Sequence, residues 1–581
     1  MTRLLSVLLL LVSGSAFSAQ WTQTNLVNWT PGVTVGVQGG IPTNRTNLID
    51  VTQSPYFADN TGVIDASTAI QNAVDAATSN QVVYLPAGTY KFAATLAVQV
   101  NKNLVNTIPI TIRGAGTNTI IVPTSAVNGA YFINGGSDQT TTTTTIAAGG
   151  LVAGSSNVTV SSTAGFPVGA LAHVYASDNT NQYASPVTLH VSSYRNNRGQ
   201  EVMITATNAT QITFWPPLYS SYNGTNGGIY TENYQMNGVG LENFAINMTN
   251  TGSSTVGIQF HRSVNCWMTN VVVYNAYSYN IYVWEAVFAQ LQHCSVGPTA
   301  RVGNNGSGYK FDTVSASLLE NCISIQNFPS LEMNFGSSGN VVAYNFFWDT
   351  YQTQSGASID SNHGPHNEFN LYEGNECPYF QADGFFGSTS DDTAYRNWLH
   401  EIQPETSATN GFYLALSLNR FTRNYNIVGN FIGTNGVHGI DIRFGDPNIG
   451  NWGNDGTNAP PWPDWPAMLS AAPGAGPGQY VWQEVDTNVF PNTLMQANYF
   501  YFTNGVNTPL TGGTNLQNSL YLAAKPSFFG NLTYPPFDIS NTNVNLKAIP
   551  AGYRYFTGND PPVGPINTQS LGTGTFGTST Q

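Results

Sequence analysis

Short apolar runs separated by turns rich in Asn and Gly recur along most of the chain. The runs "NVVVYN" and "NVVAYNFFW" are typical, with β-branched and aromatic residues bounded by Asn. Such runs are too short for helices and carry the residue types that favour strands. The pattern therefore predicts many short strands joined by tight turns.

An Asn stands before an apolar, acidic or aromatic residue at nearly constant spacing, mostly 22 to 33 residues. A fixed repeat with strands and little helix is typical of a solenoid. We predict an all-β protein, a right-handed parallel β-helix running from about residue 60 to 530. Stacked Asn side chains would form hydrogen bonds with one another and with buried backbone groups at the turn. We therefore expect one turn of the coil to hold Asn321, Asn345, Asn375, Asn397 and Asn430. The same repeat includes Asn265, Asn498 and, in one coil, His293.

Three cysteines share this period, since Cys266, Cys294 and Cys322 are each 28 residues apart. We expect a stack of buried thiols, although strands of adjacent coils lie close enough for a disulfide. The spacing does not match a zinc site.

The remainder of the chain divides around this repeat. Residues 1–18 read as a signal peptide, because Arg3 precedes a short apolar run and small residues, so we expect a secreted or periplasmic protein. We expect an N-terminal cap and first coils over 19–137, a β insertion lobe over 138–230 and the β-helix over 231–530. A loop insertion falls at 450–480, and a C-terminal cap with a disordered tail at 531–581. Within the C-terminal part, residues 519–539 are expected to cover the last coil.

The N-terminal segment carries a more specific signal. Ile70, Val74 and Ala77 form one apolar face of a short helix, with Asp65 or Ser67 as its N-cap, and "VVYLPAGTY" and "ITIRGAG" follow as strands. This segment resembles the opening of the pectate-lyase superfamily, of the rhamnogalacturonase/epimerase type, in which a helix plugs the first coil. The resemblance implies a right-handed β-helix and a carbohydrate substrate. It does not imply one reaction, because hydrolases, lyases, epimerases and phage-like binders share the scaffold.

Composition narrows the choice of partners. Charged residues are 8% of the chain, the net charge is −14, and the 17 basic residues are scattered. Nucleic acid and anionic membranes need a concentrated basic patch, so we expect neither as a partner. A neutral polymer suits this surface better, and the sequence does not decide the oligomeric state.

Alternation along the strands separates inward from outward side chains. With Tyr309 and Phe311 inside, Lys310 and Asp312 face outward, and the same reasoning applies to the equivalent strand of each coil. The outer stripe then contains Lys310, Asp312, Glu332, Asp360, Asp383, Asp441 and Arg443, with His363, Asp391 and Asp392 at its loop edge and Trp284 and Tyr413 beside it.

Paired carboxylates on such a stripe could cleave a glycosidic bond. We expect a glycoside hydrolase with catalytic residues among Asp360, Asp383, His363, Glu332, Asp391 and Asp392. Substrate-binding residues are expected among Trp284, Lys310, Asp312, Tyr413, Asp441 and Arg443. His366, Glu368 and Glu373 lead into a different strand and are expected to belong to the scaffold.

Two alternatives stay open. A polysaccharide lyase could use Lys310, His363 or an Arg as the base and hold calcium on the acidic stripe. A noncatalytic sugar-binding or adhesive β-helix is the other. We expect no cofactor for a hydrolase, and calcium only for a lyase.

Overall fold

The computed structural model describes residues 26–560, apart from 99–107, 125–128, 133–140, 145, 147–149, 177–197, 223–226, 233, 250–254, 301–305, 349, 351–356, 385–386, 401–413, 435–440, 445–480, 484–488, 502–504, 507–515 and 543. The predicted signal peptide, the tail, Tyr413 and the whole of the predicted 450–480 loop lie outside the described residues.

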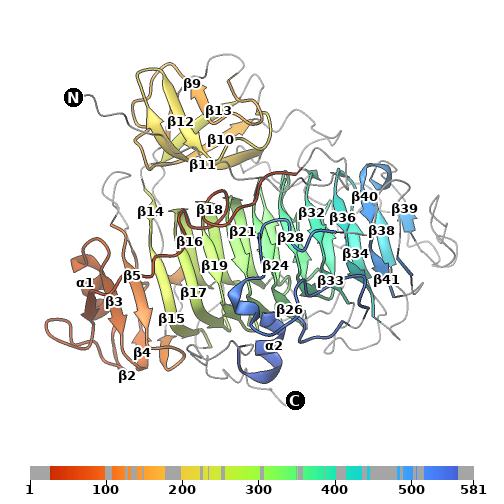
Figure 1. Ribbon diagram of the computed structural model, residues 1–581. Coiled ribbons are helices and arrows are strands. Elements are labelled where there is room, and N and C mark those ends of the chain that lie inside the picture. The colour runs from red at the N-terminus through yellow and green to blue at the C-terminus, as the bar shows by residue number, and fades with distance from the viewer. Residues whose placement is uncertain are drawn as a thin grey trace, which may run out of the picture.

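Three ladders of parallel strands form the three faces of a long solenoid (Figure 1). The first runs through β1 (Leu48–Asp50), β3 (Val82–Leu85), β5 (Thr111–Gly114), β15 (Gly240–Asn247), β17 (Trp267–Tyr274), β19 (Gln290–Gln292), β22 (Leu318–Glu320), β25 (Val341–Ala343), β28 (Leu371–Glu373), β32 (Thr393–Tyr395), β36 (Asn426–Val428) and β40 (Leu494–Gln496). The second comprises β2 (Thr61–Asp65), β4 (Gly88–Phe92), β6 (Thr119–Pro123), β20 (Ser295–Val296), β23 (Ile323–Ile325), β26 (Phe346–Trp348), β29 (Glu376–Cys377), β33 (Trp398–Leu399), β37 (Phe431–Ile432) and β41 (Tyr499–Phe500), joined through β15 and β17.

The third ladder holds the candidate site. It comprises β7 (Gly129–Phe132) and β14 (Met236–Asn237), both paired with β16 (Thr255–Val264), then β18 (Tyr279–Val287), β21 (Ser307–Ser315), β24 (Leu331–Asn334), β27 (Ile359–Asp360), β30 (Phe380–Ala382), β34 (Leu414–Leu418), β38 (Asp441–Phe444) and β39 (Val481–Gln483). The right-handed parallel β-helix is confirmed. Its coils span β1 to β41, so they begin before residue 60 and end before residue 530.

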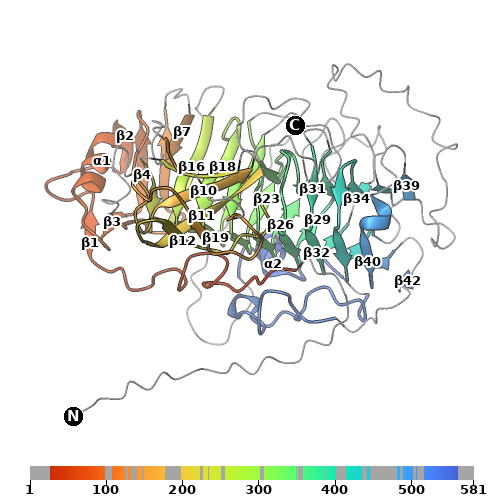
Figure 2. The same cartoon turned by 90° about the horizontal axis from the view of Figure 1, so that it is seen from above.

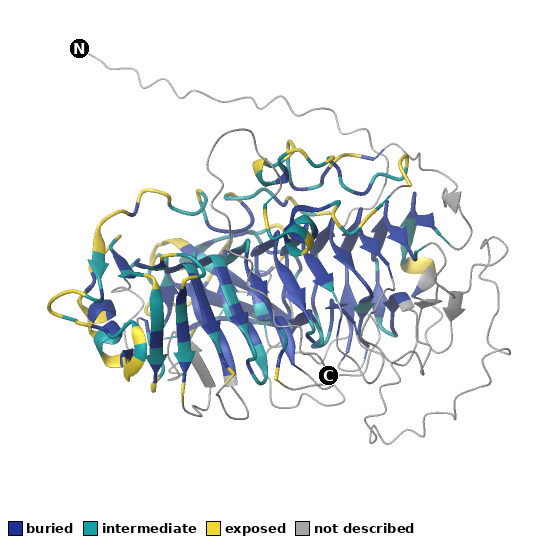
Figure 3. Ribbon diagram, turned by 90° about the horizontal axis from the view of Figure 1, so that it is seen from below, coloured by how far each residue is buried: buried dark blue, intermediate teal, exposed yellow. Residues whose placement is uncertain are grey.

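Side chains alternate across the third ladder as predicted. Tyr309, Phe311, Met333 and Ile359 are fully buried in the core that runs through the coils. Figure 3 shows buried residues along most of the strands of the solenoid. Their outward neighbours are therefore fixed in direction by the packing of the core.

The asparagine stack begins later than predicted. Five asparagines form an unbroken chain: Asn345, Asn375, Asn397, Asn430 and Asn498. The side-chain Nδ2 of each donates to the Oδ1 of the next at 2.9–3.0 Å. The prediction for Asn321 is wrong. Cys322, not Asn321, stands in register with Asn345, and its N–H donates to Asn345 Oδ1. Asn321 instead takes the left-handed position (φ 52°) one residue earlier.

The cysteines are buried free thiols. Cys294 and Cys322 lie in register on consecutive coils, as the stack prediction requires. Cys266 does not, because Trp267 pairs with Gln290, which places Cys266 beside Ala289. Equal sequence spacing was therefore insufficient to give equal register.

The N-terminal helix α1 (Ser67–Ala76) is present, with Ile70 and Val74 buried. Its N-cap is Ala66, which has no side-chain cap, so neither predicted N-cap residue is correct. Asp65 lies one residue earlier and accepts hydrogen bonds from the N–H and Oγ of Ser67. The helix thus covers the first coils, as predicted.

The β insertion is a separate antiparallel sheet. Its six strands are β8 (Thr141–Thr144), β9 (Asn157–Thr159), β10 (Leu171–Ala176), β11 (Arg198–Thr207), β12 (Gln211–Trp215) and β13 (Gly228–Glu232), in the order β8-β13-β10-β11-β12-β9. The lobe has its own buried core, including Val174, Val202 and Phe214. It lies over the edge of the third ladder, above β16 and β18 (Figure 2).

The C-terminal segment, residues 516–560, runs along the outside of the first two ladders and includes α2 (Pro550–Thr557). Leu520 N–H donates to Glu373, and Tyr521 OH donates to Glu320, on coils far from the last one. The prediction that residues 519–539 cover the last coil is therefore wrong. Their apolar side chains pack instead on outward apolar residues such as Val341 and Leu371. Among the described residues, none of the helices has the length and apolar character to cross a membrane.

Candidate active site

A row of polar side chains crosses the third ladder at one register. Tyr282, Lys310, Glu332 and Asp360 are paired successively from β18 to β27, and Gln381 of β30 follows. Each lies beside an inward core residue, so the strand alternation turns all of them outward. The predicted register of Lys310, Glu332 and Asp360 is correct.

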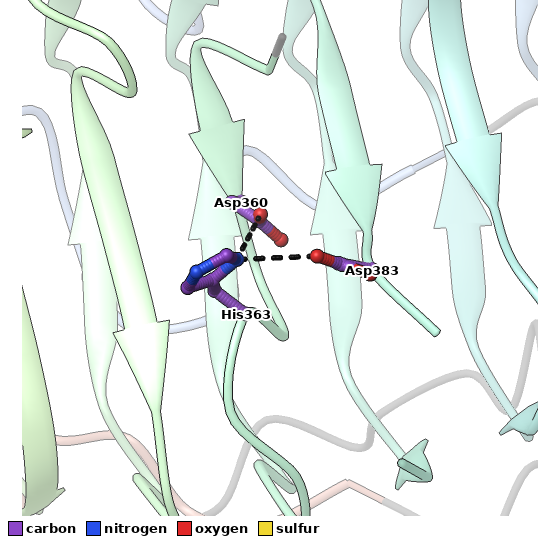
Figure 4. A group of neighbouring side chains, drawn as sticks. All are labelled: Asp360, His363 and Asp383. Atoms are coloured by element: carbon purple, nitrogen blue, oxygen red, sulfur yellow. Dashed lines mark hydrogen bonds and ion pairs between the residues drawn. The ribbon is translucent and has the colours of Figure 1, made fainter. Parts of the chain in front are cut away.

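Asp360, His363 and Asp383 meet at the end of this row (Figure 4). His363 Nδ1 lies 3.1 Å from Asp383 Oδ2 and 3.5 Å from Asp360 Oδ2. The His363 side chain is 36% exposed, whereas those of Asp360 and Asp383 are 8% and 4% exposed. The two carboxylates therefore lie beneath an imidazole that solvent can reach.

Burial and neighbouring charges shift the pKa values of Asp360 and His363, so that the two groups can have different roles. Burial raises the pKa of Asp360 to about 6, and the neighbouring charge of Asp383 acts in the same direction while His363 opposes it. Burial alone would lower the pKa of His363, but hydrogen bonds to Asp360 and Asp383 and the charge of Glu332 raise it well above its usual value. Near pH 6 the site thus holds an imidazolium and a carboxyl group poised between its two protonation states.

Lys310 and Glu332 form the adjoining ion pair. Lys310 Nζ lies 2.7 Å from Glu332 Oε1, and Ser307 Oγ donates to Glu332 Oε2 at 2.5 Å. Burial opposes ionisation of Glu332, but Lys310 and His363 hold its pKa at about 2. Glu332 is therefore a fixed negative charge rather than a proton donor.

Aromatic rings flank the row. Trp284 stacks on His261 at 4.1 Å between ring centroids, and Tyr282 lies nearly parallel to Trp284 at 5.9 Å. Tyr282 OH donates to Asp312 Oδ2 at 2.6 Å, and Lys310 Nζ lies 4.6 Å from the centre of the Tyr279 ring. Tyr279 and Tyr282 were not predicted, although the spacing of Tyr282 and Trp284 by two residues in "NIYVWEAV" places both on one face.

The predicted strand around Asp383 is wrong. The predicted outer stripe places Asp383 within a strand of this ladder, but the strand of this coil is β30 (Phe380–Ala382), and Asp383 follows its end. Gln381 therefore takes the register position next to Asp360. Asp383 still reaches His363 because the chain turns directly after the strand.

Asp391 and Asp392 do not join this cluster. They lie at a later turn, where Asp392 Oδ1 accepts from Asn370 Nδ2 at 3.1 Å inside the solenoid. Asn370 in turn accepts from Asn340 Nδ2, so Asp392 continues a second buried polar ladder. Asn424 Nδ2 donates to Asp391 at the same turn. The structure therefore does not bring Asp391 and Asp392 to the predicted cluster, because Asp392 points into the buried polar ladder.

The residues expected to be scaffold lie away from the cluster. Glu373, on the first ladder, accepts hydrogen bonds from Tyr344 OH and from the backbone N–H of Leu520 in the C-terminal segment. Glu368 accepts hydrogen bonds from Ser220 and Tyr222, which lie between β12 and β13 of the insertion lobe. His366 N–H donates to Ser388 O. The backbone of Asp441 and Arg443 belongs to β38, but their side chains, like Tyr413, lie outside the described part of the chain.

The donor set of the cluster does not fit calcium. Calcium takes six to eight oxygen ligands, whereas one imidazole nitrogen faces both carboxylates here. Glu332, the next oxygen donor, is already held by Lys310 and Ser307. A mixed set of nitrogen and carboxylate ligands suits a transition metal better.

Comparison with known proteins gives one family match. Residues 52–297 match the model of the family described as rhamnogalacturonase A/epimerase, pectate lyase-like. This confirms the resemblance over a segment that is less than half of the 581-residue chain. A search of curated proteins finds no match.

Several solved structures are similar to the chain. The tailspike protein gp49 from Pseudomonas phage LKA1 aligns with 69% of this chain and 65% of its own, at 15% identity and a TM-score of 0.46. The A-module of a mannuronan C-5 epimerase from Azotobacter vinelandii aligns with 68% of this chain and 91% of its own, at 13% identity and a TM-score of 0.29. The chain thus spans slightly less than two thirds of the tailspike.

Proposed function

We propose that the protein is an exported glycoside hydrolase and that Asp360, His363 and Asp383 form the active site in which it cleaves a polysaccharide. The carrying observation is the pairing of two buried carboxylates around one exposed imidazole, with the pKa of Asp360 raised to about 6. The family model matching residues 52–297 takes its description from carbohydrate-active enzymes, which supports a carbohydrate substrate.

The chemistry uses the two carboxylates differently. Asp360 in its protonated form donates its proton to the glycosidic oxygen as the bond to the leaving sugar breaks. Asp383 attacks the anomeric carbon, and the resulting ester is hydrolysed by water, whose proton returns to Asp360. His363 holds both carboxylates in place and compensates their charge. Asp360 and Asp383 are the catalytic residues, and His363 is a positioning residue.

Lys310 and Glu332 support this arrangement from the adjoining register. Their ion pair places a fixed negative charge beside His363, which stabilises the imidazolium. Because Lys310 faces both Glu332 and Asp312, its charge is already matched by carboxylates. This disfavours a lyase, which needs a cation facing the carboxylate of a uronate sugar.

Incubation of the protein with a panel of neutral and uronate-containing polysaccharides tests the proposal. New reducing ends without ultraviolet-absorbing unsaturated products support a hydrolase, whereas such products would establish a lyase. If the protein binds a glycan without cleaving it, the protein is a noncatalytic sugar-binding β-helix. If a chelator abolishes activity and a divalent transition metal restores it, Asp360, His363 and Asp383 bind a metal ion rather than transfer protons. N-terminal sequencing of protein recovered outside the cytoplasm tests export.

A further inference from the structure

The side chains of Asp360, His363 and Asp383 point toward one another (Figure 4). His363 Nδ1 and one oxygen of each carboxylate all lie within 4.8 Å of one another. Asp360 and His363 belong to the coil of β27, and Asp383 follows β30 of the next coil. The pairing of two coils therefore brings one nitrogen and two oxygen donors together, and a metal ion could bridge them.

The distances between these atoms fit a zinc ion. Zn²⁺ binds imidazole nitrogen and carboxylate oxygen at about 2.0–2.2 Å in tetrahedral geometry, so two of its ligand atoms are about 3.4 Å apart. His363 Nδ1 lies 3.1 Å from Asp383 Oδ2 and 3.5 Å from Asp360 Oδ2, on either side of that value. The two carboxylate oxygens are no more than 4.8 Å apart. Rotation of one carboxylate is enough to close this last distance.

The charges of the cluster match a divalent cation. A neutral His363 with ionised Asp360 and Asp383 carries two negative charges. Lys310, at the adjoining register, already pairs with Glu332 and faces Asp312. The two aspartate side chains are buried, so water and salt screen their charges little. A dication would neutralise them in place of the proton that His363 Nδ1 shares with them.

Asn362 holds the two carboxylate ligands in position. Its backbone N–H donates to Asp360 Oδ1 at 3.3 Å, while Asp360 Oδ2 faces His363. Its side-chain Nδ2 donates to the backbone carbonyl of Asp383 at 2.7 Å and so ties the two coils together. Hydrogen bonds of this kind orient the ligands of metal sites. The donor atoms are therefore held near one another before an ion binds.

A buried acceptor lies beside the turn that carries His363. Asn334 is 1% exposed, and its Oδ1 accepts no hydrogen bond from the described residues. A Cβ added to Gly364, the residue after His363, would lie 3.0 Å from this oxygen. Zinc with three protein ligands keeps a water molecule as the fourth, and buried waters pair with polar groups that otherwise have no partner. Asn334 Oδ1 is thus an acceptor for the water of a bound zinc ion.

We propose that Asp360, His363 and Asp383 bind Zn²⁺ and that the bound ion inhibits the hydrolase. The ion binds His363 Nδ1 and one oxygen of each carboxylate, and the Nδ1 proton leaves to solvent. Asp360 can then no longer donate its proton, and Asp383 can no longer attack the anomeric carbon. The inhibition rests on the proposed function, whereas the binding of zinc does not.

Calorimetric titration of the chelator-treated, dialysed full-length chain with Zn²⁺ measures binding without a glycan. We expect a single ion per chain, and Co²⁺ in its place should give the visible absorption of a tetrahedral site. Loss of a group that only orients a ligand weakens metal binding about 10–100-fold. His363→Asn and Asp383→Asn, which remove ligands, should therefore weaken it at least about tenfold.

His366→Asn is the matched control. His366 lies three residues after His363 but outside the cluster, and its φ of 70° suits asparagine. Its substitution should leave the affinity for zinc unchanged. If His363→Asn does not fold, Asp383→Asn decides. Equal affinity in the wild type and the ligand variants, or no saturable binding by the wild type, overturns the metal site and leaves the hydrolase in place.

Cleavage assays test the inhibition. On the polysaccharide that the wild type cleaves, saturating Zn²⁺ should lower kcat/KM by about 10²-fold or more, because proton transfer by Asp360 is lost, and a chelator should restore it. Zinc that binds through these residues without slowing cleavage overturns the inhibition, as does cleavage that requires zinc. A wild type that binds zinc and cleaves no glycan overturns the proposed function while the metal site stands.

Discussion

His363 Nδ1 lies 3.1 Å from Asp383 Oδ2, although the two residues belong to consecutive coils and are 20 positions apart in the sequence. Parallel strands one coil apart create this contact, since the coil spacing of about 4.8 Å brings equivalent positions together. The same imidazole nitrogen also faces Asp360. One side chain thus fixes two carboxylates that could cleave a glycosidic bond.

The pH dependence of activity should report the proton on Asp360. The folded pKa is raised to about 6, so the acid form needed for catalysis is lost as the pH rises through that value. We expect kcat/KM on the cleaved polysaccharide to fall about tenfold for each pH unit above this point. A profile that stays flat from pH 5 to pH 8 contradicts the assignment of Asp360 as the acid.

The spacing of the carboxylates predicts the stereochemistry. One oxygen of Asp360 and one oxygen of Asp383 lie no more than 4.8 Å apart. This distance is nearer to the separation of about 5–5.5 Å in retaining glycosidases than to the separation of about 6.5–9.5 Å in inverting ones. Proton NMR of the first product should therefore show the anomeric configuration of the substrate. Inversion would rule out Asp383 as a nucleophile.

The asparagine stack should contribute strongly to stability. Asn375→Ala removes acceptors for the Asn345 N–H and Nδ2 and the donor to Val342 O, all of them buried. Each unpaired buried group costs roughly 1–3 kcal/mol, so the free energy of unfolding should fall by at least about 3 kcal/mol. Denaturant unfolding measures this. Asn157→Ala, at an exposed position in the lobe, should change it by less than about 0.5 kcal/mol.

The C-terminal segment should be held more weakly as the pH rises from acidic to neutral values. Burial raises the pKa of Glu373, which contacts Leu520, to about 7 and that of Glu320, which contacts Tyr521, also to about 7. Because the folded state binds these protons more tightly than the unfolded state, stability falls as the pH rises from the ordinary value of 4.5 through 7. Each group contributes roughly 3 kcal/mol over this window.

Urea midpoints at several pH values test the contribution of Glu373. Glu373→Gln removes one titrating group, so its midpoint should fall less between pH 5 and pH 8 than that of the wild type. Equal slopes for the two proteins would show that Glu373 is not protonated in the folded state at pH 5. Turnover should be unchanged, because Glu373 lies on the first ladder.

Local alternation was sufficient to predict the outward direction of Lys310, Glu332 and Asp360, since each has a large core residue beside it. It was insufficient for Asp383 and Asp392, where strands of two or three residues end in turns. There the register depends on pairing with neighbouring coils, which a single sequence does not display. Asn321 illustrates the same limit, because a one-residue shift moves its side chain from the stack to the outside.

The path of residues 516–560 was unpredictable for a related reason. Apolar residues such as Tyr521 and Phe529 show that the segment must cover something. Which surface it covers depends on outward apolar residues of the middle coils, such as Leu371, which look like core residues in the sequence.

The most direct test of the account compares Asp360→Asn with the wild type on the polysaccharide that the wild type cleaves. The substitution preserves the shape of the side chain and removes its proton transfer, which contributes about 10²–10⁴-fold to catalysis. We predict that kcat falls by at least 10²-fold while the melting temperature and the affinity for the glycan remain close to those of the wild type. Full turnover by a folded Asp360→Asn protein would contradict the account, because cleavage would then occur elsewhere on the solenoid.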